Sequence, residues 1–332
     1  MREDRRPTLT DVATRAGVSK SLVSIVMRDE PGASDQTRRR VLAAAEQLGY
    51  HPDSRARLLR SGRSRLLGVV FGIQHGFHAD LVTDLYTAAR ETGYELALSA
   101  VTPDRAETEA ITGLLQDRCE ALILLGPQSS TASLTRLATR LPVVAIARPI
   151  RSAAVDVVRT ADAEGLRLAV DHLAGLAHRR IAHIDGGRAA GAADRRRGYR
   201  DAMRRYGLEP RLVPGGLTEE DGAAAARALL DDLPTAVTVF NDRCATGVLD
   251  VLARSGTRVP EDISVVGYDD SRLARLAHIN LTTIAQDTAT MTRLAVARAI
   301  DRVGEVPITD RELVVPPRLV VRGTTGPADQ AR

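Results

Sequence analysis

From residue 66 onward, short runs of Val, Ile and Leu alternate with segments of helical periodicity. The apolar runs predict strands over residues 66–71, 94–101, 121–125, 143–147, 180–185, 236–240 and 263–268. The helical segments are 78–92, 104–117, 134–140, 162–176, 195–206, 219–230, 242–255 and 287–303. Apolar strands that alternate with helices are typical of parallel sheets covered on both faces. Two such sets predict two α/β lobes, with a ligand cleft at the carboxyl ends of their strands.

Composition excludes several other classes of protein. The chain has 332 residues, which leaves room for two domains and a small additional module. Its two cysteines cannot form a disulfide framework, and no apolar run reaches the roughly 18 residues of a membrane span. The N-terminus lacks the apolar core of a secretory signal, so we expect a cytoplasmic protein. Lys20 is the only lysine, and no G-x-x-x-x-G-K-[ST] phosphate loop surrounds it.

Positive charge is concentrated at the beginning of the chain. Residues 1–65 contain 14 Lys/Arg and 8 Asp/Glu, whereas the remaining residues contain 32 and 34. The net charge of +4 therefore comes entirely from the first fifth of the sequence. Such a region suits a polyanion, and nucleic acid is the leading candidate. A solvated basic tail is the alternative.

Residues 8–27 have the pattern of two short helices joined by a tight turn. Thr10 is the expected cap of the first helix, and Gly17 sits where that helix must end. Ser19 is the expected cap of the second helix. The apolar stripe that packs the second helix on the first is Leu22, Val23 and Val26. Two helices of this kind form a helix-turn-helix unit, whose second helix can enter the major groove.

A third helix is expected over residues 34–49, capped by Ser34 and ended by Gly49. Its predicted core stripe is Val41, Leu42, Ala45 and Leu48. Residues 53–64 then form a short basic segment, capped by Asp53, that is a weak helix candidate when isolated in water.

These motifs resemble the lactose-repressor (LacI) family of bacterial transcription regulators. The resemblance rests on L-T-D-V-A-x-x-A-G-V-S at residues 9–19, S-x-x-T-R-x-R-V at 34–41, G-Y-x-P at 49–52 and A-R-x-L-R-S-G-R-S at 56–64. It continues with A-H-R-R-I at 177–181, R-R-R-G-Y at 195–199, F-N-D-x-x-A-x-G at 240–247 and V-P-E-D-I-S-V-V-G-Y-D-D at 259–270. The implied fold is a helix-turn-helix headpiece and a hinge helix, followed by a two-lobed α/β effector domain like that of periplasmic binding proteins.

The resemblance also implies domain boundaries. The headpiece is 1–52 and the hinge 53–64. The first lobe is 65–158 plus 286–316, the second lobe is 159–285 plus 317–323, and a flexible tail is 324–332. That tail has no leucine heptad, so a homodimer is expected and a coiled-coil tetramer is not.

Contacts to operator DNA are implied along the headpiece and hinge. Leu59 is the expected minor-groove wedge, whose unstacking cost is offset by the extra contacts that a bent duplex allows. The full set of implied DNA contacts is Thr8, Ser19, Lys20, Ser21, Ser24, Ile25, Arg28, Ser34, Thr37, Tyr50, Ala56, Arg57 and Leu59. Lysine suits the guanine O6/N7 acceptors, and the Ile25 side chain suits a thymine methyl.

The resemblance implies an effector site in the cleft between the lobes. Its implied residues are His75, Phe77, Asp80, Arg148, Arg195, Asn241 and Asp269. Asparagine and carboxylate groups can bridge sugar hydroxyls, and arginine donates a fork of hydrogen bonds. A carbohydrate is therefore the favoured effector, and a nucleoside or purine is second. A structural cap or ion pair is the alternative role for each residue.

The sequence departs from the family pattern at five positions. Ile25 replaces a long polar residue, Arg28 and Asp53 replace asparagines, and Ala147 and Ala161 replace aspartates. Because the two alanines change the polarity of the cleft, the identity of the effector is not inherited from the resemblance.

Other function classes have weaker support. His75 and His78 have H-x-x-H spacing, but nothing nearby completes a metal site, so no metal and no cofactor are expected. No G-x-S-x-G, H-E-x-x-H or G-x-G-x-x-G motif appears, so an enzyme is not expected. The alternatives are an enzyme on the two-lobed fold and an activator or ligand-free regulator. A periplasmic binding protein is excluded, since it needs a signal peptide and has no use for the headpiece.

Overall fold

The computed structural model describes residues 7–27, 29–50, 63–74 and 76–329. The chain divides into two compact units, residues 1–64 and 65–332, which are treated separately below. The predicted hinge helix, with its Asp53 cap, lies outside the described residues. The same holds for the predicted contact residues Arg28, Ala56, Arg57, Leu59 and His75.

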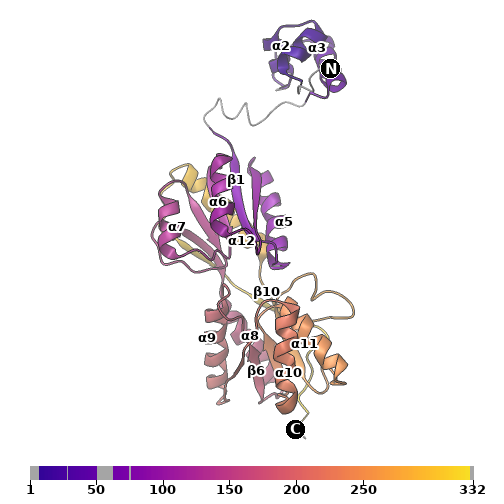
Figure 1. The fold of residues 1–332 in the computed structure, drawn as a ribbon, viewed down its shortest axis with the longest axis vertical. Coiled ribbons are helices and arrows are strands. Elements are labelled where there is room, and N and C mark those ends of the chain that lie inside the picture. Colours follow the sequence, from indigo (N-terminus) through magenta and orange to yellow (C-terminus); the bar gives the residue numbers. More distant parts are fainter. Residues whose placement is uncertain (1–6, 28, 51–62, 75, 330–332) are drawn as a thin grey trace. The chain divides into compact units, whose positions relative to one another are not determined.

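The described part of the first unit is a small helical domain (Figure 1). Its helices are α1 (Leu9–Ala16), α2 (Lys20–Met27) and α3 (Asp35–Leu48). Val12, Val23 and Val41, one from each helix, are fully buried at its centre. Gly17 ends α1 in the left-handed conformation (φ 62°), and the Ser19 hydroxyl accepts a hydrogen bond from the backbone N–H of Leu22 (3.2 Å). The predicted helix-turn-helix is therefore present.

Two predictions for this unit are wrong. Thr8, not Thr10, caps α1, because its reciprocal partner Asp11 lies three residues ahead and accepts from the Thr8 backbone N–H (2.7 Å). Leu42 is 49% exposed, and Ala44 takes its place in the core. Position 44 lies three residues after Val41 on the same helix face, whereas position 42 is rotated away from that face.

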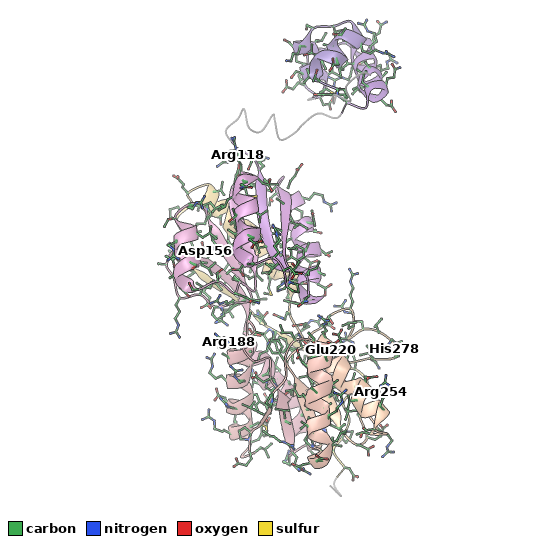
Figure 2. All side chains as sticks on the ribbon, viewed as in Figure 1. Arg118, Asp156, Arg188, Glu220, Arg254 and His278 are labelled. Carbon is green, nitrogen blue, oxygen red and sulfur yellow. The ribbon has the colours of Figure 1, made fainter. Side chains whose placement is uncertain are left out.

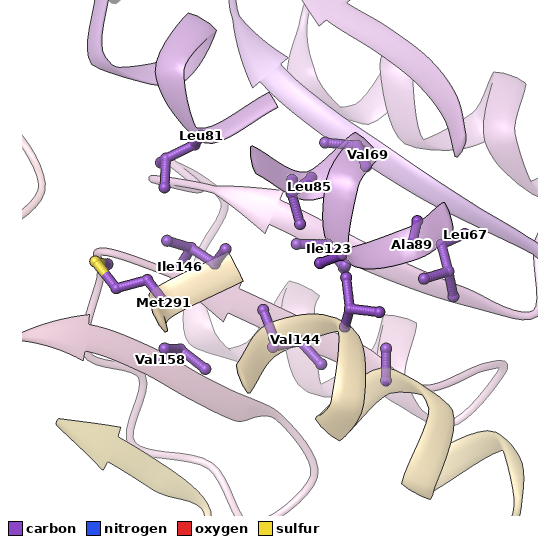
Figure 3. Close-up of a cluster of buried hydrophobic side chains, with 14 of the residues drawn as sticks. Leu67, Val69, Leu81, Leu85, Ala89, Ile123, Val144, Ile146, Val158 and Met291 are labelled. Carbon is purple, nitrogen blue, oxygen red and sulfur yellow. The ribbon is translucent and has the colours of Figure 1, made fainter. Parts of the chain in front are cut away.

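The second unit begins with a parallel sheet in the order β11-β5-β4-β3-β1-β2. Its strands are β1 (Leu66–Gly72), β2 (Glu95–Val101), β3 (Ala121–Leu125), β4 (Val143–Ile146), β5 (Asp156–Thr160) and β11 (Glu312–Val315). One face is covered by α5 (Gly76–Glu91) and α12 (Thr288–Val303), and the other by α6 (Glu107–Gln116) and α7 (Thr131–Ala138). Figure 3 shows Leu85 and Met291 in the core that lies beneath α5 and α12. We call this sheet with its helices the first lobe.

A second sheet has the order β12-β10-β9-β8-β6-β7, and only β12 is antiparallel to its neighbour among the described pairs. Its strands are β6 (Ile181–Ile184), β7 (Arg211–Val213), β8 (Ala236–Val239), β9 (Ser264–Asp269), β10 (Thr282–Ala285) and β12 (Arg318–Val320). One face packs on α8 (Asp162–Gly175) and α9 (Ala192–Arg205), and the other on α10 (Glu219–Leu229) and α11 (Asp242–Arg254). This sheet and its helices are the second lobe, so the expected two-lobed α/β fold is confirmed.

Glycine lets helices of the second lobe approach each other closely. A Cβ atom on Gly247 of α11 would lie 1.9 Å from the carbonyl oxygen of Glu219, and one on Gly222 of α10 would lie 1.9 Å from that of Cys244. A Cβ on Gly198 of α9 would lie 2.1 Å from the carbonyl oxygen of Ala163 in α8. Backbone therefore packs directly on backbone in both helix pairs.

The sequence pattern does not predict five of the strands, which are β5, β7, β10, β11 and β12. They are three to five residues long and contain polar side chains such as Arg159, Arg211 and Arg318, so they lack the apolar run that marks a buried strand. Between the sheets, the chain crosses after β5, after β10 and after β11.

The last described residues also pack on the second lobe. Thr324 is 5% exposed, and its hydroxyl donates to the Val265 carbonyl (2.7 Å) while its own carbonyl accepts from the Val265 N–H (2.8 Å). The Ala328 N–H donates to the Leu176 carbonyl (2.8 Å). Ordered contacts thus extend to residue 328, beyond the predicted start of a flexible tail at 324.

Candidate functional site

A cavity of about 1180 Å³ lies between the two lobes of the second unit. Its walls follow the carboxyl ends of parallel strands: residues 126–128 follow β3, 147–149 follow β4, 186–191 follow β6 and 215–218 follow β7. Parallel α/β sheets bind ligands at this edge. Phe77, Asp80, Arg148, Arg195, Asn241 and Asp269 all line the cavity, so the structure brings these predicted residues together.

Arg195 is the most constrained of the predicted residues. It is 5% exposed; its Nε donates to Asp162 Oδ1 (2.8 Å) and its Nη1 to the Phe240 carbonyl (2.6 Å). The guanidinium also lies 3.5 Å from the centroid of the Tyr268 ring and 4.5 Å from that of Phe240. A desolvated arginine between two aromatic rings is held in one orientation. Arg195 therefore forms a rigid part of the cavity wall.

Asp162 was not predicted to take part in the site. It is 2% exposed at the start of α8 and is the ion-pair partner of Arg195. Burial raises the pKa of Asp162, and the Arg195 charge opposes that rise. The residue follows Ala161, where the family pattern has an aspartate, but no sequence signal marks Asp162 as the partner of Arg195.

Asp269 ends β9 with an unusual backbone conformation (φ 114°) that directs it into the cavity. Its Oδ1 accepts from Gln286 Nε2 (2.8 Å), and Gln286 Oε1 accepts from the Thr160 hydroxyl (2.5 Å). Gln286, also unpredicted, thus connects two of the segments that cross between the lobes. Burial raises the pKa of Asp269, and nearby Arg195 counters only part of that rise.

Asn241 is the N-cap of α11. Its Oδ1 accepts from the Cys244 N–H (2.7 Å), and its Nδ2 donates to the Leu217 carbonyl (3.3 Å). The oxygen is therefore committed to the helix, and the remaining amide N–H is available to a ligand. Beside it, the buried Asp242 accepts from the Thr283 hydroxyl (2.6 Å) and the Ser271 N–H (2.7 Å), and burial raises its pKa.

The cavity walls also contact each other across the two lobes. Asp80 of the first lobe pairs with Arg272 of the second (3.6 Å), and burial raises the pKa of Asp80. Arg243 donates to Glu219 (2.6 Å) and to the Gln74 carbonyl. The Asp80–Arg272 ion pair bridges the two lobes, so it biases the domain toward the conformation in which it forms.

A buried histidine gives the second lobe a pH-dependent stability. His183 is fully buried on β6, its Nδ1 is 3.0 Å from the Thr238 hydroxyl, and its ring stacks on Tyr199. Burial lowers the pKa of His183 to about 4. Since an unfolded histidine has a pKa near 6.5, the unfolded chain binds a proton below that pH that the folded chain excludes. Stability is therefore lost as the pH falls from 6.5 toward 4.

We expect the exclusion of this proton from buried His183 to lower the free energy of unfolding by about 2 kcal/mol when the pH is lowered from 7.5 to 5. Urea unfolding followed by circular dichroism measures it, and His183→Gln should remove that part of the pH dependence. The buried carboxyls titrate in the opposite sense, so the difference between variant and wild type isolates the histidine. His278→Gln, at an exposed site (Figure 2), is the control. Equal pH dependence in all three proteins would contradict the prediction.

The predicted DNA contacts of the first unit fall into two groups. Lys20 and Ser21 are exposed on the first turn of α2, and Ser24 and Ile25 are half-buried one turn later. The other group has capping or packing roles: Thr8, Ser19 and Ser34 cap helices, Thr37 lies 3.0 Å from the Ser34 hydroxyl, and Tyr50 packs against the core. Lys20 and Ser21 are thus exposed predicted contacts on α2 itself, whereas the exposed Ser19 and Ser34 cap helices.

Comparisons with known proteins agree with this arrangement. Residues 8–53 match the model for bacterial regulatory proteins of the lacI family, and residues 170–325 match the periplasmic binding protein-like domain. The HTH-type transcriptional regulator GalR of Salmonella typhimurium (strain SL1344) is 34% identical over 324 residues, 95% of each chain.

Solved structures give the same result. A LacI transcriptional regulator from a Rhodococcus species is 52% identical (TM-score 0.77), over 79% of this chain and 99% of that one. The lac repressor dimer bound to operator and the anti-inducer ONPF is 30% identical (TM-score 0.81), over 97% of this chain and 100% of that one.

A helix-turn-helix unit followed by a two-lobed α/β unit with a cavity between its lobes defines a class of ligand-binding transcriptional regulators. The relatives above are transcriptional regulators rather than enzymes. The chain belongs to the LacI family of bacterial regulatory proteins. Among the described residues, no helix is long and apolar enough to cross a membrane, and no group of three or more His, Cys, Asp or Glu side chains could hold a metal ion.

Proposed function

We propose that the chain is a dimeric repressor that acts in the cytoplasm on a pseudo-palindromic operator and is controlled by a small-molecule effector. One observation carries this proposal: a capped helix-turn-helix with exposed Lys20 and Ser21 occurs in the same chain as a cavity between two lobes. The dimer is inferred from the two-fold symmetry of palindromic sites. It is also supported by the related lac repressor, which is described as a dimer bound to operator and to an anti-inducer.

The effector is proposed to be a carbohydrate that contacts Arg148, Asn241 and Asp269 in the cavity. A mixture of donors and acceptors around apolar surface suits a molecule with several hydroxyl groups. The scarcity of aromatic residues, 3% of the chain, weakens the alternative of a nucleoside, whose base is usually held by stacking. Phe77, Asp80 and Arg195 complete the proposed site.

The direct test is to select operator sequences from genomic DNA with the purified full chain, and then to footprint the selected sites. The proposal expects two symmetric half-sites, a dimer in sedimentation, and a 5- to 150-fold change in operator affinity on effector binding. Release from DNA would mark an inducer, and tighter binding a corepressor. Failure to prefer any sequence over random DNA would contradict the proposed function.

Lys20 offers a sharper test at one residue. Lys20→Ala removes the only lysine side chain, whose ammonium suits the guanine O6/N7 acceptors, and should weaken binding to the selected operator about 10- to 100-fold. Fluorescence anisotropy with operator and with random DNA measures the effect. Lys20→Arg, which keeps the charge and the donors, should retain most of the affinity. An equal loss of affinity on both DNAs would instead assign Lys20 to the phosphate backbone.

A further inference from the structure

The charged side chains that line the cavity are unequal in number. Among the described residues, the lining arginines are Arg148, Arg188, Arg195, Arg243 and Arg272, and the lining carboxylates are Asp80, Asp194, Asp221 and Asp269. Positive charge is therefore in excess, and the way each group is paired determines where that excess lies.

Each lining carboxylate is already engaged by the chain. Asp80 pairs with Arg272 (3.6 Å) and Asp194 with Arg197 (2.9 Å). Asp221 closes a capping box at the start of α10, where it accepts from the Thr218 N–H (3.0 Å). Asp269 accepts from Gln286 and lies 3.9 Å from Arg195. Burial also raises the pKa of Asp269, so its negative charge is weakened rather than left to attract a cation.

Three of the lining arginines are engaged as fully as the carboxylates. Arg195, Arg243 and Arg272 each form an ion pair, with Asp162, Glu219 and Asp80 respectively. Their charges are therefore balanced within the protein.

Arg148 and Arg188 differ from the other three. Arg148 donates from Nη1 to the carbonyls of Pro127 and Ser129 (both 2.7 Å), which orient its guanidinium without neutralising its charge. Arg188 is exposed in the loop between β6 and α9, at the end of the second lobe that faces the first (Figure 2). In the part of the chain that the structure describes, neither arginine has a carboxylate within ion-pair distance.

The two unneutralised arginines come from opposite walls of the cavity, Arg148 from the first lobe and Arg188 from the second. Next to Arg148, position 147 is an alanine that also lines the cavity, so the chain supplies no counter-ion there. A guanidinium recognises carboxylate and phosphate groups by paired, charge-assisted hydrogen bonds.

We infer that the effector carries an acidic group, a carboxylate or a phosphate, that is held between Arg148 and Arg188. This inference rests on the proposed function, because it assigns the chemical class of the ligand in the same cavity. The rest of the ligand contacts the neutral donors and acceptors of the walls, so the effector is an acidic sugar.

The test uses matched probes that differ in the acidic group. Calorimetric titration of the full chain compares glucose with glucuronate, galactose with galacturonate, and glucose with gluconate and glucose 6-phosphate. We expect at least one acid to bind tenfold or more tightly than its neutral partner, with an affinity that falls as salt is raised. The sugar-acid and sugar-phosphate arms distinguish the two sources of negative charge.

Variants then assign the binding to the two arginines. Arg188→Gln and Arg148→Gln should each weaken the bound acid tenfold or more, since each removes a charge-assisted hydrogen bond. Arg200→Gln is the matched control, because Arg200 is an exposed arginine of α9 that does not line the cavity. Circular dichroism spectra would show that each variant is folded.

Several outcomes would overturn the inference. They are a neutral sugar that binds at least as tightly as its acid, an acid whose affinity is unchanged by both variants, and no binding of any acid at 10 mM. Operator binding is measured on the same protein preparation. Specific DNA binding without acid binding defeats only this inference, whereas loss of specific DNA binding defeats the proposed function.

Discussion

Arg195→Ala should destabilise the second unit by about 3–5 kcal/mol. The substitution leaves the 2% exposed Asp162 without its ion-pair partner, removes the donor to the Phe240 carbonyl, and opens a void between the rings of Tyr268 and Phe240. A buried carboxylate that loses its partner must either stay charged without compensation or take up a proton. Urea unfolding followed by circular dichroism at pH 7.5 measures the loss.

Two comparisons separate the buried network from a general effect of removing arginine. Arg200→Ala, on the exposed side of the same helix, should change stability by less than about 0.5 kcal/mol. Removing both charges in an Asp162→Leu, Arg195→Met double variant should cost much less than the sum of the single variants, because no unpaired charge remains. Additive single effects, or a loss below 1 kcal/mol for Arg195→Ala, would contradict the role assigned to the pair.

Gly247→Ala should also be strongly destabilising, by about 3 kcal/mol or more. The added Cβ would lie 1.9 Å from the Glu219 carbonyl oxygen, and backbone cannot move aside as the end of a flexible side chain can. Helices α10 and α11 would have to separate, which exposes the core they share with β8. Thermal and urea unfolding measure the effect, and Gly222→Ala should behave in the same way because its Cβ would meet the Cys244 carbonyl.

Gly175→Ala, in α8, is the control for the two glycine substitutions in α10 and α11. Gly175 is the last residue of α8, and a Cβ there would have no neighbour within 4 Å. Since alanine has the higher helix propensity, this variant should be neutral or more stable by up to about 1 kcal/mol. If Gly247→Ala were as stable as Gly175→Ala, the close approach of α10 and α11 would not constrain the fold.

The sequence predicts the elements of this fold best where a pattern is long. Strands β1 and β3 consist of apolar residues and glycine, β9 has an apolar centre between Ser264 and Asp269, and α11 and α12 extend for more than three turns. Short elements with polar side chains, such as β7 and β12, depend on a neighbouring strand for their conformation, so local pattern does not reveal them. The prediction that Thr10 caps α1 is wrong because Thr8 and Thr10 are both residue types that cap helices. The reciprocal hydrogen bonds with Asp11 make Thr8 the cap.

The residues of the candidate site also divide into those that the sequence predicts and those that it does not. Phe77, Asp80, Arg148, Arg195, Asn241 and Asp269 were predicted from motifs and all line the cavity. Asp162, Gln286 and Arg188 were not, because their importance comes from what lies opposite them. Asp162 matters because Arg195 is buried against it, and Arg188 because no carboxylate in the described residues accompanies it. Pairing across 33 residues or more is a property of the folded chain, so single-sequence reasoning does not reach it.

The order of the strands has a consequence for how the chain is made. The first lobe is completed only by β11, which pairs with β5, and the second only by β12, which pairs with β10. Both strands lie within residues 312–320, after all the other described strands of the two sheets. During synthesis from the N-terminus, neither sheet can therefore be completed until residues 312–320 have left the ribosome. The helix-turn-helix unit, whose described helices end at residue 48, requires none of these later strands, so it can fold long before the domain that would control it.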